Sequence, residues 1–220
     1  MLTPLQERIA EIVSGLPDAR GFALAGAGGL LVRGLIDRQT RDLDYFTVPG
    51  EEEALSALRD ALERALDRAA LDHRRRRDLS TFVRIEVSDG DDWCEIDLAI
   101  DYRALPAEPS DYGPTLAVRE LAANKVLALF DRAEARDFLD LVVLTRHFEL
   151  QGLMDLAAQK DTGFDTAGFL EALSSLQRFT SADFGVSEAE CERLRATVEI
   201  WRNELGSDQG WEPPDRGLDR

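Results

Sequence analysis

Apolar residues along this chain recur with the two spacings that distinguish helices from strands. Residues 4–14 carry apolar side chains at helical spacing and stop at Gly15, and residues 51–70 place their leucines along one helical stripe. A short apolar run over residues 21–25 leads through a glycine turn into a further helix. Three more apolar segments predict strands over residues 42–48, 80–87 and 93–100.

The second half of the chain has a different pattern. From Pro114 it has no strand signal and is helical through Glu149, with further helices predicted over residues 166–178 and 187–205. Because prolines and glycines cluster just before this change, we expect a domain boundary near residue 113. The predicted fold is α+β: a mixed sheet with flanking helices (residues 1–113), a helical domain (114–206) and a flexible tail (207–220).

The charge of the chain narrows its possible partners. Its 26 basic and 43 acidic side chains give a net charge of −17, which repels nucleic acid and anionic membranes except at a local basic patch. The two cysteines and two histidines lack the spacing of a zinc site. Because the sequence shows neither a signal peptide nor an apolar membrane span, we expect a soluble, cytoplasmic protein without a membrane partner.

Two carboxylates on one strand supply the candidate chemistry. Asp42 and Asp44 are two residues apart, so their side chains point to the same face of the predicted strand. Oxygen ligands of this kind suit Mg²⁺, although an exposed acidic strand edge is the simpler interpretation of such a pair taken alone. A later strand adds a third acid, because Asp97 shares a face with Glu95.

A glycine turn precedes the acidic pair. Gly26-Ala27-Gly28-Gly29 opens a predicted helix, where free N–H groups and the helix dipole favour an anion such as phosphate. Twelve residues separate this turn from Asp42. The turn, this spacing, the Asp-x-Asp pair and the later acid together resemble the nucleotidyltransferase superfamily typified by DNA polymerase β.

The flanking sequences FALAGAGGLLVRGLIDRQTRDLDYFTV and NKVLALFDRAEARDFLDLVVL resemble, more narrowly, the AbiEii/AbiGii type of nucleotidyltransferase toxin. The resemblance covers most of the chain. It implies a polymerase-β-like domain followed by a helical domain, with the active site in the cleft between them. One departure concerns the glycine turn: where this family usually reads LAGGT or LAGGS, the aligned positions here are Ala27 and Gly28, so the hydroxyl that helps to hold the triphosphate is absent.

The resemblance implies a role for each matching residue. Asp42 and Asp44 would bind the metal, with Asp97 as the third acid, and Lys125 and Asp140 would also be required for catalysis. The residues implied to contact the nucleotide are Gly26, Gly28, Gly29, Arg41, Lys125, Arg132 and Arg136.

The resemblance also implies a reaction. An Mg²⁺-dependent enzyme would transfer NMP from an NTP to the 3′ end of tRNA and so block translation, and a cognate antitoxin would be encoded nearby, often with a winged-helix DNA-binding domain. A small-molecule acceptor such as an antibiotic hydroxyl, or a protein side chain, keeps the chemistry, and the negative charge favours it. A degenerate member that binds nucleotide without catalysis is a third alternative, because the hydroxyl is missing.

Two further predictions concern the positions of charged residues, first of Lys125 and Asp140 and then of the arginine run. Lys125 and Asp140 would lie about 22 Å apart on a straight helix, so a shared site requires a break between about residues 130 and 136. Without that break Lys125 and Asp140 are surface charges: the alternative is a solvated helix lysine for Lys125, and i,i+4 ion pairs on an exposed face for Arg132, Arg136 and Asp140. The run of four arginines from Arg74 through Arg77 is predicted to form a loop that binds RNA, with a solvated loop offset by Asp67, Asp72 and Asp78 as the equal alternative.

Overall fold

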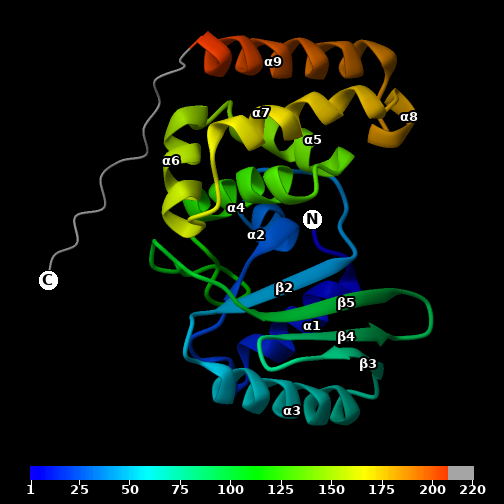
Figure 1. The fold of residues 1–220 in the computed structure, drawn as a ribbon. Coiled ribbons are helices and arrows are strands. Elements are labelled where there is room, and N and C mark those ends of the chain that lie inside the picture. Colours follow the sequence, from blue (N-terminus) through cyan, green and yellow to red (C-terminus); the bar gives the residue numbers. More distant parts are fainter. Residues whose placement is uncertain (208–220) are drawn as a thin grey trace, which may run out of the picture. The chain divides into compact units, whose positions relative to one another are not determined.

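The structure is a computed structural model that describes residues 1–207 of the chain. Its residues pack into two compact units, Met1–Leu121 and the residues from Ala122 onward. Figure 1 shows a sheet with helices in the first unit and helices alone in the second. The flexible tail predicted over residues 207–220 lies outside the described residues, apart from Ser207.

The elements of the first unit alternate between helices and strands. In chain order they are α1 (Pro4–Ser14), the 3-10 helix η1 (Pro17–Ala19), β1 (Ala23–Leu24), α2 (Gly26–Val32), β2 (Asp42–Thr47), α3 (Glu52–Arg68), β3 (Asp72–Asp78), β4 (Phe82–Ser88) and β5 (Trp93–Ile100). The start of α1 is fixed by a capping box in which the side chains of Thr3 and Gln6 each accept a hydrogen bond from the other residue's backbone N–H.

The five strands form one mixed sheet. Their order is β1-β2-β5-β4-β3, with β2 and β5 parallel and every other neighbouring pair antiparallel. This arrangement confirms the predicted mixed sheet with flanking helices. Its parallel pair brings two strands together that are separated by about fifty residues of chain, because α3, β3 and β4 form the connection.

One face of the sheet is packed against α1 and α3. Alternate residues of each strand point into this core, and their neighbours point to the opposite face, here called the open face. The four leucines of the α3 stripe are fully buried, and each stabilises the fold by about 1.5–3 kcal/mol. The buried strand residues facing them include Leu43, Tyr45, Val83, Ile85, Val87, Cys94, Ile96 and Leu98.

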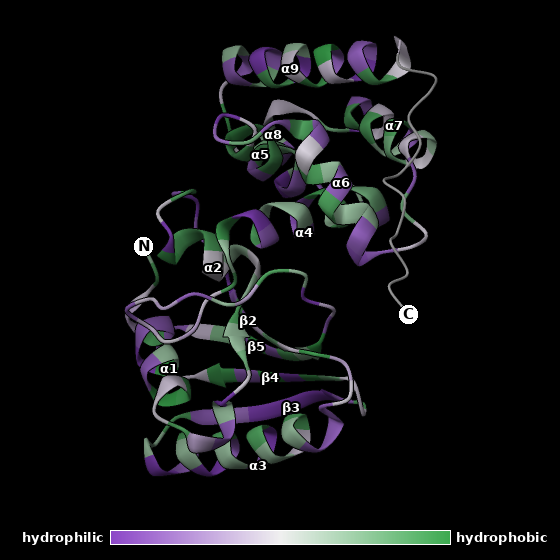
Figure 2. Ribbon diagram, turned by 90° about the vertical axis from the view of Figure 1, so that its left-hand side faces the viewer, coloured by the Kyte–Doolittle hydropathy of each residue, from purple (hydrophilic) through white to green (hydrophobic). Residues whose placement is uncertain are grey.

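The arginine run does not form the predicted loop. Residues 72–78 make the edge strand β3, which pairs with β4 and contains a bulge between Arg75 and Arg77. Figure 2 shows β3 as hydrophilic along its length, in contrast to the mixed colouring of β4 and β5. The sequence DHRRRRD carries no apolar alternation, so this strand is set by pairing with β4 and its polarity suits an unpaired sheet edge.

The division between the units falls within a helix. α4 (Val118–Asp131) begins in the first unit, whose last residue is Leu121. Residues 114–116 belong to the first unit because the N–H of Leu24 in β1 donates to Pro114 O at 2.8 Å and the N–H of Leu116 donates to Leu24 O at 2.9 Å. The domain boundary near residue 113 stays a prediction.

The second unit is helical throughout its described residues. Its elements after α4 are α5 (Ala135–Leu144), α6 (Leu150–Lys160), α7 (Thr166–Ser174), η2 (Ser175–Arg178), α8 (Ser181–Phe184) and α9 (Glu188–Ser207). α6 was not predicted from the sequence. Two groups of phenylalanines in tilted or edge-to-face contact support this unit, one around Phe164 and one around Phe179. None of the described helices combines the length and apolar character that crossing a membrane requires.

Candidate active site

The three predicted acids lie together on the open face of the sheet. Asp42 and Asp44 are half-buried there, whereas Leu43 between them is fully buried in the core. In the parallel pairing of β2 with β5, Asp42 is opposite Glu95 and Asp44 is opposite Asp97. The structure therefore gathers carboxylates from two strands that are distant in sequence.

Each member of the pair on β2 has a neighbour that fixes its position. The hydroxyl of Thr40 hydrogen-bonds to the Asp42 carboxylate, and the backbone oxygen of Thr40 accepts a 2.9 Å hydrogen bond from Gln6 of α1. Gly26 lies directly against the Asp44 carboxylate with a φ of +55°, and a Cβ at Gly26 would collide with that carboxylate. A glycine is therefore required there both by its backbone conformation and by its contact with Asp44.

Asp97 is held by an arginine on the neighbouring strand. Nε and Nη2 of Arg84, on β4, donate to the two oxygens of Asp97 at 2.7 and 2.6 Å, and Nη1 of Arg84 lies 3.3 Å from Glu95. Asp97 is buried, so this two-point contact compensates for much of the loss of its hydration. The same hydrogen bonds raise the pKa of Arg84 and keep it charged.

The three glycines of the turn differ in their surroundings. Gly28 and Gly29 are buried: a Cβ at Gly28 would lie 3.1 Å from Leu43, and one at Gly29 would lie 2.9 Å from Leu121. The N–H of Gly29 also donates to Ala25 O within the helix at 2.7 Å. The absence of side chains at these two positions is thus explained by the packing of α2, and Gly26 is the glycine that lies at the acids.

The donor chemistry of the site fits a divalent cation. Asp42 and Asp44 offer carboxylate oxygens, the ligands that hard cations such as Mg²⁺ prefer. In residues 1–207, however, no group of three or more His, Cys, Asp or Glu side chains is gathered closely enough to hold a metal ion. The geometry explains this result, because the third acid is turned to Arg84.

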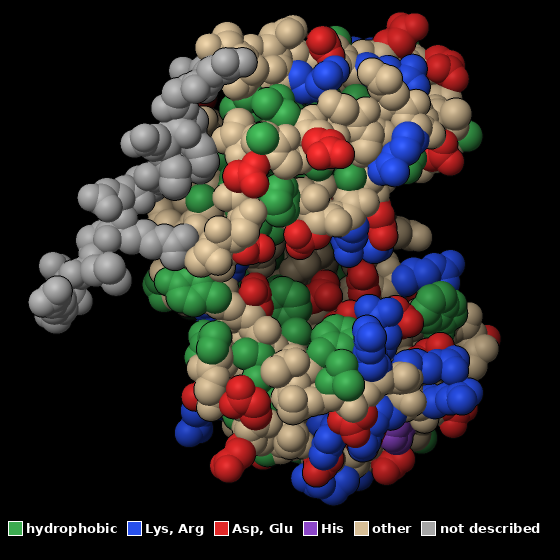
Figure 3. Space-filling view, viewed as in Figure 1, with side chains coloured by type: hydrophobic (Ala, Val, Ile, Leu, Met, Phe, Trp, Pro, Cys, Tyr) green, Lys and Arg blue, Asp and Glu red, His purple; other side chains and the backbone are tan. Residues whose placement is uncertain are grey.

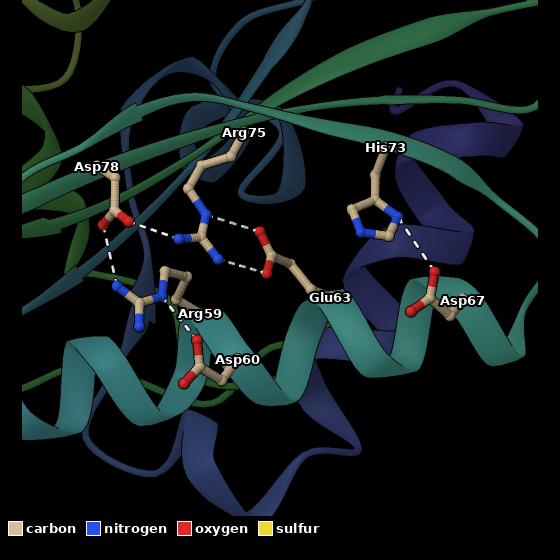
Figure 4. A network of polar contacts seen from close by, with 7 residues as sticks. All are labelled: Arg59, Asp60, Glu63, Asp67, His73, Arg75 and Asp78. Atoms are coloured by element: carbon tan, nitrogen blue, oxygen red, sulfur yellow. Dashed lines mark hydrogen bonds and ion pairs between the residues drawn. The ribbon is translucent and has the colours of Figure 1, made fainter.

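The four arginines of β3 are not equivalent. Arg75 points to α3, where it donates to both oxygens of Glu63 at 2.9 and 2.6 Å and to Asp78 at 2.5 Å (Figure 4). Arg76 forms a similar two-point contact with Glu86 on β4. Arg74 is exposed, and exposed Arg77 lies 5.8 Å from the ring centre of Phe82. The predicted patch is thus reduced, because two of its arginines already bind carboxylates.

The surface of this region is mixed in charge. Figure 3 shows arginine side chains gathered over the part of the first unit that carries α3, β3 and β4, with acidic side chains interspersed. Glu63, Asp78 and Glu86 account for some of this mixing, because they bind the arginines of β3. The positive field of the run is therefore weaker than its sequence indicates.

A buried cluster of charges occupies the second unit. The helix break predicted between residues 130 and 136 is confirmed: α4 ends at Asp131, α5 begins at Ala135, and Ala133 between them has a φ of +45°. This break brings Lys125 Nζ within 2.9 Å of Asp140 and 3.6 Å of Asp137. Lys125 and Asp140 are therefore neighbours in a buried cluster, so the alternatives of a solvated lysine for Lys125 and of an exposed i,i+4 ion pair for Asp140 are wrong.

Asp137 completes this cluster. It is fully buried, and Arg132 donates to its two oxygens at 2.9 and 3.0 Å. Burial raises the pKa of Asp137, but the hydrogen bonds from Arg132 and the charge of Lys125 outweigh burial, and the net pKa is lowered. Arg136, the other predicted phosphate contact of this segment, lies 2.8 Å from Glu134.

Three residues that position these groups were not predicted from the sequence: Arg84, Asp137 and Thr40. Arg84 could have been noticed from the alternation of Arg84 and Glu86 with buried residues on β4, which places both on the face of the acids. Asp137 lies in the quoted segment ARDFLDL, three residues before Asp140. Thr40 gave no signal, because its role depends on contacts with Gln6 and Asp42.

Two solved structures share this fold. JHP933 from Helicobacter pylori aligns with a TM-score of 0.57 at 17% identity, over 94% of this chain and 96% of that chain. The nucleotidyltransferase toxin MenT4 (Rv2826c) from Mycobacterium tuberculosis H37Rv aligns with a TM-score of 0.61 at 15% identity, over 96% of this chain and 86% of that chain. At such identities the likeness establishes a shared fold and nothing more.

The family follows from the sequence. The profile of the family described as "Nucleotidyl transferase AbiEii toxin, Type IV TA system" matches residues 11–196. The chain therefore belongs to the AbiEii family of nucleotidyltransferase toxins, as the resemblance predicted. No match was found among the curated proteins.

Proposed function

We propose that this toxin transfers NMP from an NTP to the 3′-terminal hydroxyl of a tRNA, with Mg²⁺ as the cofactor. The observation that carries the proposal is the register of the parallel strands, which places Asp97 beside Asp44 on the face that also holds Asp42. Carboxylates gathered in this way suit the transfer of a nucleotidyl group from a metal-bound triphosphate.

The residues of the first unit divide the work of the reaction. Asp42 and Asp44 would hold Mg²⁺, which when bound supplies positive charge to the triphosphate. The turn from Gly26 through Gly29 approaches the phosphates with its backbone, and Arg41 adds a guanidinium beside Asp42. Asp97 accepts the proton of the attacking hydroxyl, or ligates a second ion, once its contact with Arg84 is released.

The bonds of the proposed step balance. The acceptor oxygen forms a bond to the α-phosphorus while the bond between that phosphorus and the bridging oxygen breaks, so pyrophosphate leaves. The hydroxyl proton passes to Asp97 or to solvent. Lys125, with Arg132 and Arg136, is proposed to neutralise the triphosphate, and Asp140 orients Lys125 through their 2.9 Å contact.

The acceptor RNA is proposed to bind through the arginine run. Of its members, Arg74 and Arg77 are the ones that the geometry favours, because Arg75 and Arg76 bind Glu63 and Glu86. The family's description as part of a type IV toxin–antitoxin system supports a cognate antitoxin as a partner. We also propose a cytoplasmic location, where NTPs and tRNA occur.

One experiment tests the reaction. The purified protein is incubated with Mg²⁺, each labelled NTP in turn, and total tRNA, periodate-blocked tRNA or no acceptor. Label should enter only unblocked tRNA, and Asp44→Ala should abolish the transfer while leaving the circular dichroism spectrum unchanged. Exposed Asp91, in the turn between β4 and β5, gives the matched control Asp91→Ala.

Other outcomes identify the alternatives. Equal labelling of blocked and unblocked tRNA would exclude the 3′ end as the acceptor. Transfer to the protein itself or to an added aminoglycoside, but not to RNA, would favour a protein or small-molecule acceptor. Nucleotide binding without transfer to any acceptor would indicate a non-catalytic member of the family.

A further inference from the structure

Trp93 is a large aromatic side chain exposed on the open face of the sheet. It begins β5 and alternates with Cys94, Ile96 and Leu98, which point into the core, so it lies on the same face as Asp97. Its exposed fraction is 40%, whereas Trp201, in the second unit, is buried. An exposed indole beside a row of carboxylates is not explained by the packing of the core.

A guanidinium lies against this ring. The Cζ atom of Arg41 is 4.8 Å from the ring centre of Trp93, which is a cation–π contact. Arg41 immediately precedes Asp42, and its backbone oxygen accepts a 2.8 Å hydrogen bond from the N–H of Glu95. The strand pairing that aligns the acids therefore also places the Arg41–Trp93 pair beside them.

We infer that the Arg41–Trp93 pair is a stacking site for a nucleobase near the 3′ end of the acceptor RNA, an inference that rests on the proposed function. Aromatic rings and guanidinium planes bind the flat faces of unpaired bases in a sequence-tolerant way. The open face around Asp42 and Asp97 is acidic and repels phosphate. The Arg41–Trp93 pair offers an apolar ring and a positive charge there, which favour the binding of a nucleic acid.

The order of the strands assigns the Trp93 ring to the acceptor rather than to the NTP, whereas Arg41, which directly precedes Asp42, is also proposed to contact the NTP phosphates. β2 has β1 on one side and β5 on the other, and α2 with Gly26 follows directly from β1. The glycine turn proposed for the triphosphate thus belongs to the β1 side of Asp44, whereas Trp93 belongs to the β5 side. Along β5, Trp93 lies about 13 Å from Asp97, a distance that a short single strand can span.

A second arginine–aromatic contact on the same face agrees with a path for RNA along β5. Phe82, on β4, has the guanidinium of Arg84 at 5.6 Å and that of Arg77 at 5.8 Å from its ring centre. Ala99, its partner on β5, is two residues beyond Asp97. Arginine–aromatic contacts therefore flank the third acid on both sides along the strand, as expected of a surface that guides a single strand.

Binding without turnover tests the inference. Affinity for fluorescently labelled tRNA and for a short single-stranded RNA is measured at fixed salt in the absence of NTP, and affinity for an NTP analogue with Mg²⁺ is measured separately. Trp93→Ala should weaken RNA binding roughly 10- to 100-fold and leave nucleotide binding unchanged, whereas Trp93→Phe should keep most of the RNA affinity. Tyr102→Ala, at another exposed aromatic beyond the opposite end of β5, should bind RNA like the wild type.

A spectroscopic measurement reports the stacking itself. RNA should quench the part of the indole fluorescence that Trp93→Phe removes. Unchanged RNA affinity in Trp93→Ala, no binding of RNA by the wild type, or a loss of NTP affinity alone would each overturn the assignment. The binding assay is independent of the transfer assay described above. If RNA binding depends on Trp93 but the transfer assay shows no NMP transfer, the proposed reaction is rejected and this binding site is retained.

Discussion

Arg84 binds the carboxylate of Asp97 through two hydrogen bonds of 2.6 and 2.7 Å, and the sheet register places the same carboxylate beside Asp44. The third acid is thus compensated by a protein cation. Removal of that cation would leave a buried carboxylate without its main partner, a change that a bound metal ion could offset.

This relationship predicts a stability effect that depends on metal. Arg84→Ala should lower the free energy of unfolding by about 1–3 kcal/mol, because it leaves Asp97 buried and its acceptor oxygens unsatisfied. Millimolar Mg²⁺ or Mn²⁺ should restore more of the thermal stability of the variant than of the wild type. Thermal unfolding with and without the ion measures both. An equal response of the two proteins to the ion would show that Asp97 does not reach the metal.

Gly26 offers a test of the contact with Asp44. Gly26→Ala should abolish nucleotide transfer and reduce stability, because the added Cβ collides with the Asp44 carboxylate. Gly34 is the matched control: its φ of +68° imposes a similar backbone penalty, of about 1 kcal/mol, but a Cβ there meets nothing within 4 Å. Gly34→Ala should remain active. Comparable activity in the two variants would mean that the position of Asp44 tolerates displacement.

The arginines of β3 are predicted to separate into two groups. Combined Arg74→Ala and Arg77→Ala should weaken RNA binding and reduce the salt slope of log K by roughly one to two, because each phosphate contact releases counterions. Arg75→Ala should instead cost up to about 1 kcal/mol of stability through the loss of Glu63 and Asp78 contacts, with RNA binding little changed. Salt titrations and chemical denaturation measure these effects. If Arg75→Ala weakened RNA binding and the combined variant did not, the RNA surface would lie on the α3 side of β3.

The parts of the fold that follow from local pattern could be predicted. β2 and β5 alternate buried and exposed residues, and α3 has a regular leucine stripe, so each was located within a few residues. β3 was not found because its stability comes from pairing with β4 rather than from its own apolar residues.

The candidate site shows the same division. The sequence places Asp42 and Asp44 on one face because that depends on two neighbouring residues. The position of Asp97 beside Asp44 depends on the strand order, and the contact of Arg84 with Asp97 depends on the register of a third strand. Such partners lie on separate strands, so no spacing in the sequence identifies them. The Lys125–Asp140 contact could be inferred because one helix break controls it.

Asp137 predicts a specific dependence of stability on pH. The pKa of Asp137 is lowered in the folded state, so the unfolded chain binds a proton at this residue first as the pH falls. The resulting stabilisation is fully present above the unfolded pKa of about 3.9 and is lost as the pH falls through the folded pKa. Asp137→Asn should be less stable at pH 7 and should lose less further stability on acidification below about pH 4. Urea denaturation from neutral to acidic pH measures both slopes. Parallel curves would show that Asp137 titrates alike in both states.

Lys125 and Asp140 provide the last prediction, which concerns stability and activity together. Because the pair is buried at 2.9 Å, Lys125→Met or Asp140→Asn alone removes the closest opposite charge from a buried group, although Asp137 stays 3.6 Å from Lys125, and each should destabilise the protein by about 3–5 kcal/mol. The double variant should be less destabilised than the sum of the two losses, since neither charge of the pair remains.

If both residues also serve one transition state, each single variant, assayed under conditions in which it is folded, should lose most NMP transfer. The double variant should then be little worse than either single variant. Denaturation and transfer assays on the four proteins give both cycles. Coupled stability with full transfer activity in the folded variants would restrict Lys125 and Asp140 to a structural role and leave the chemistry to the acids of the sheet.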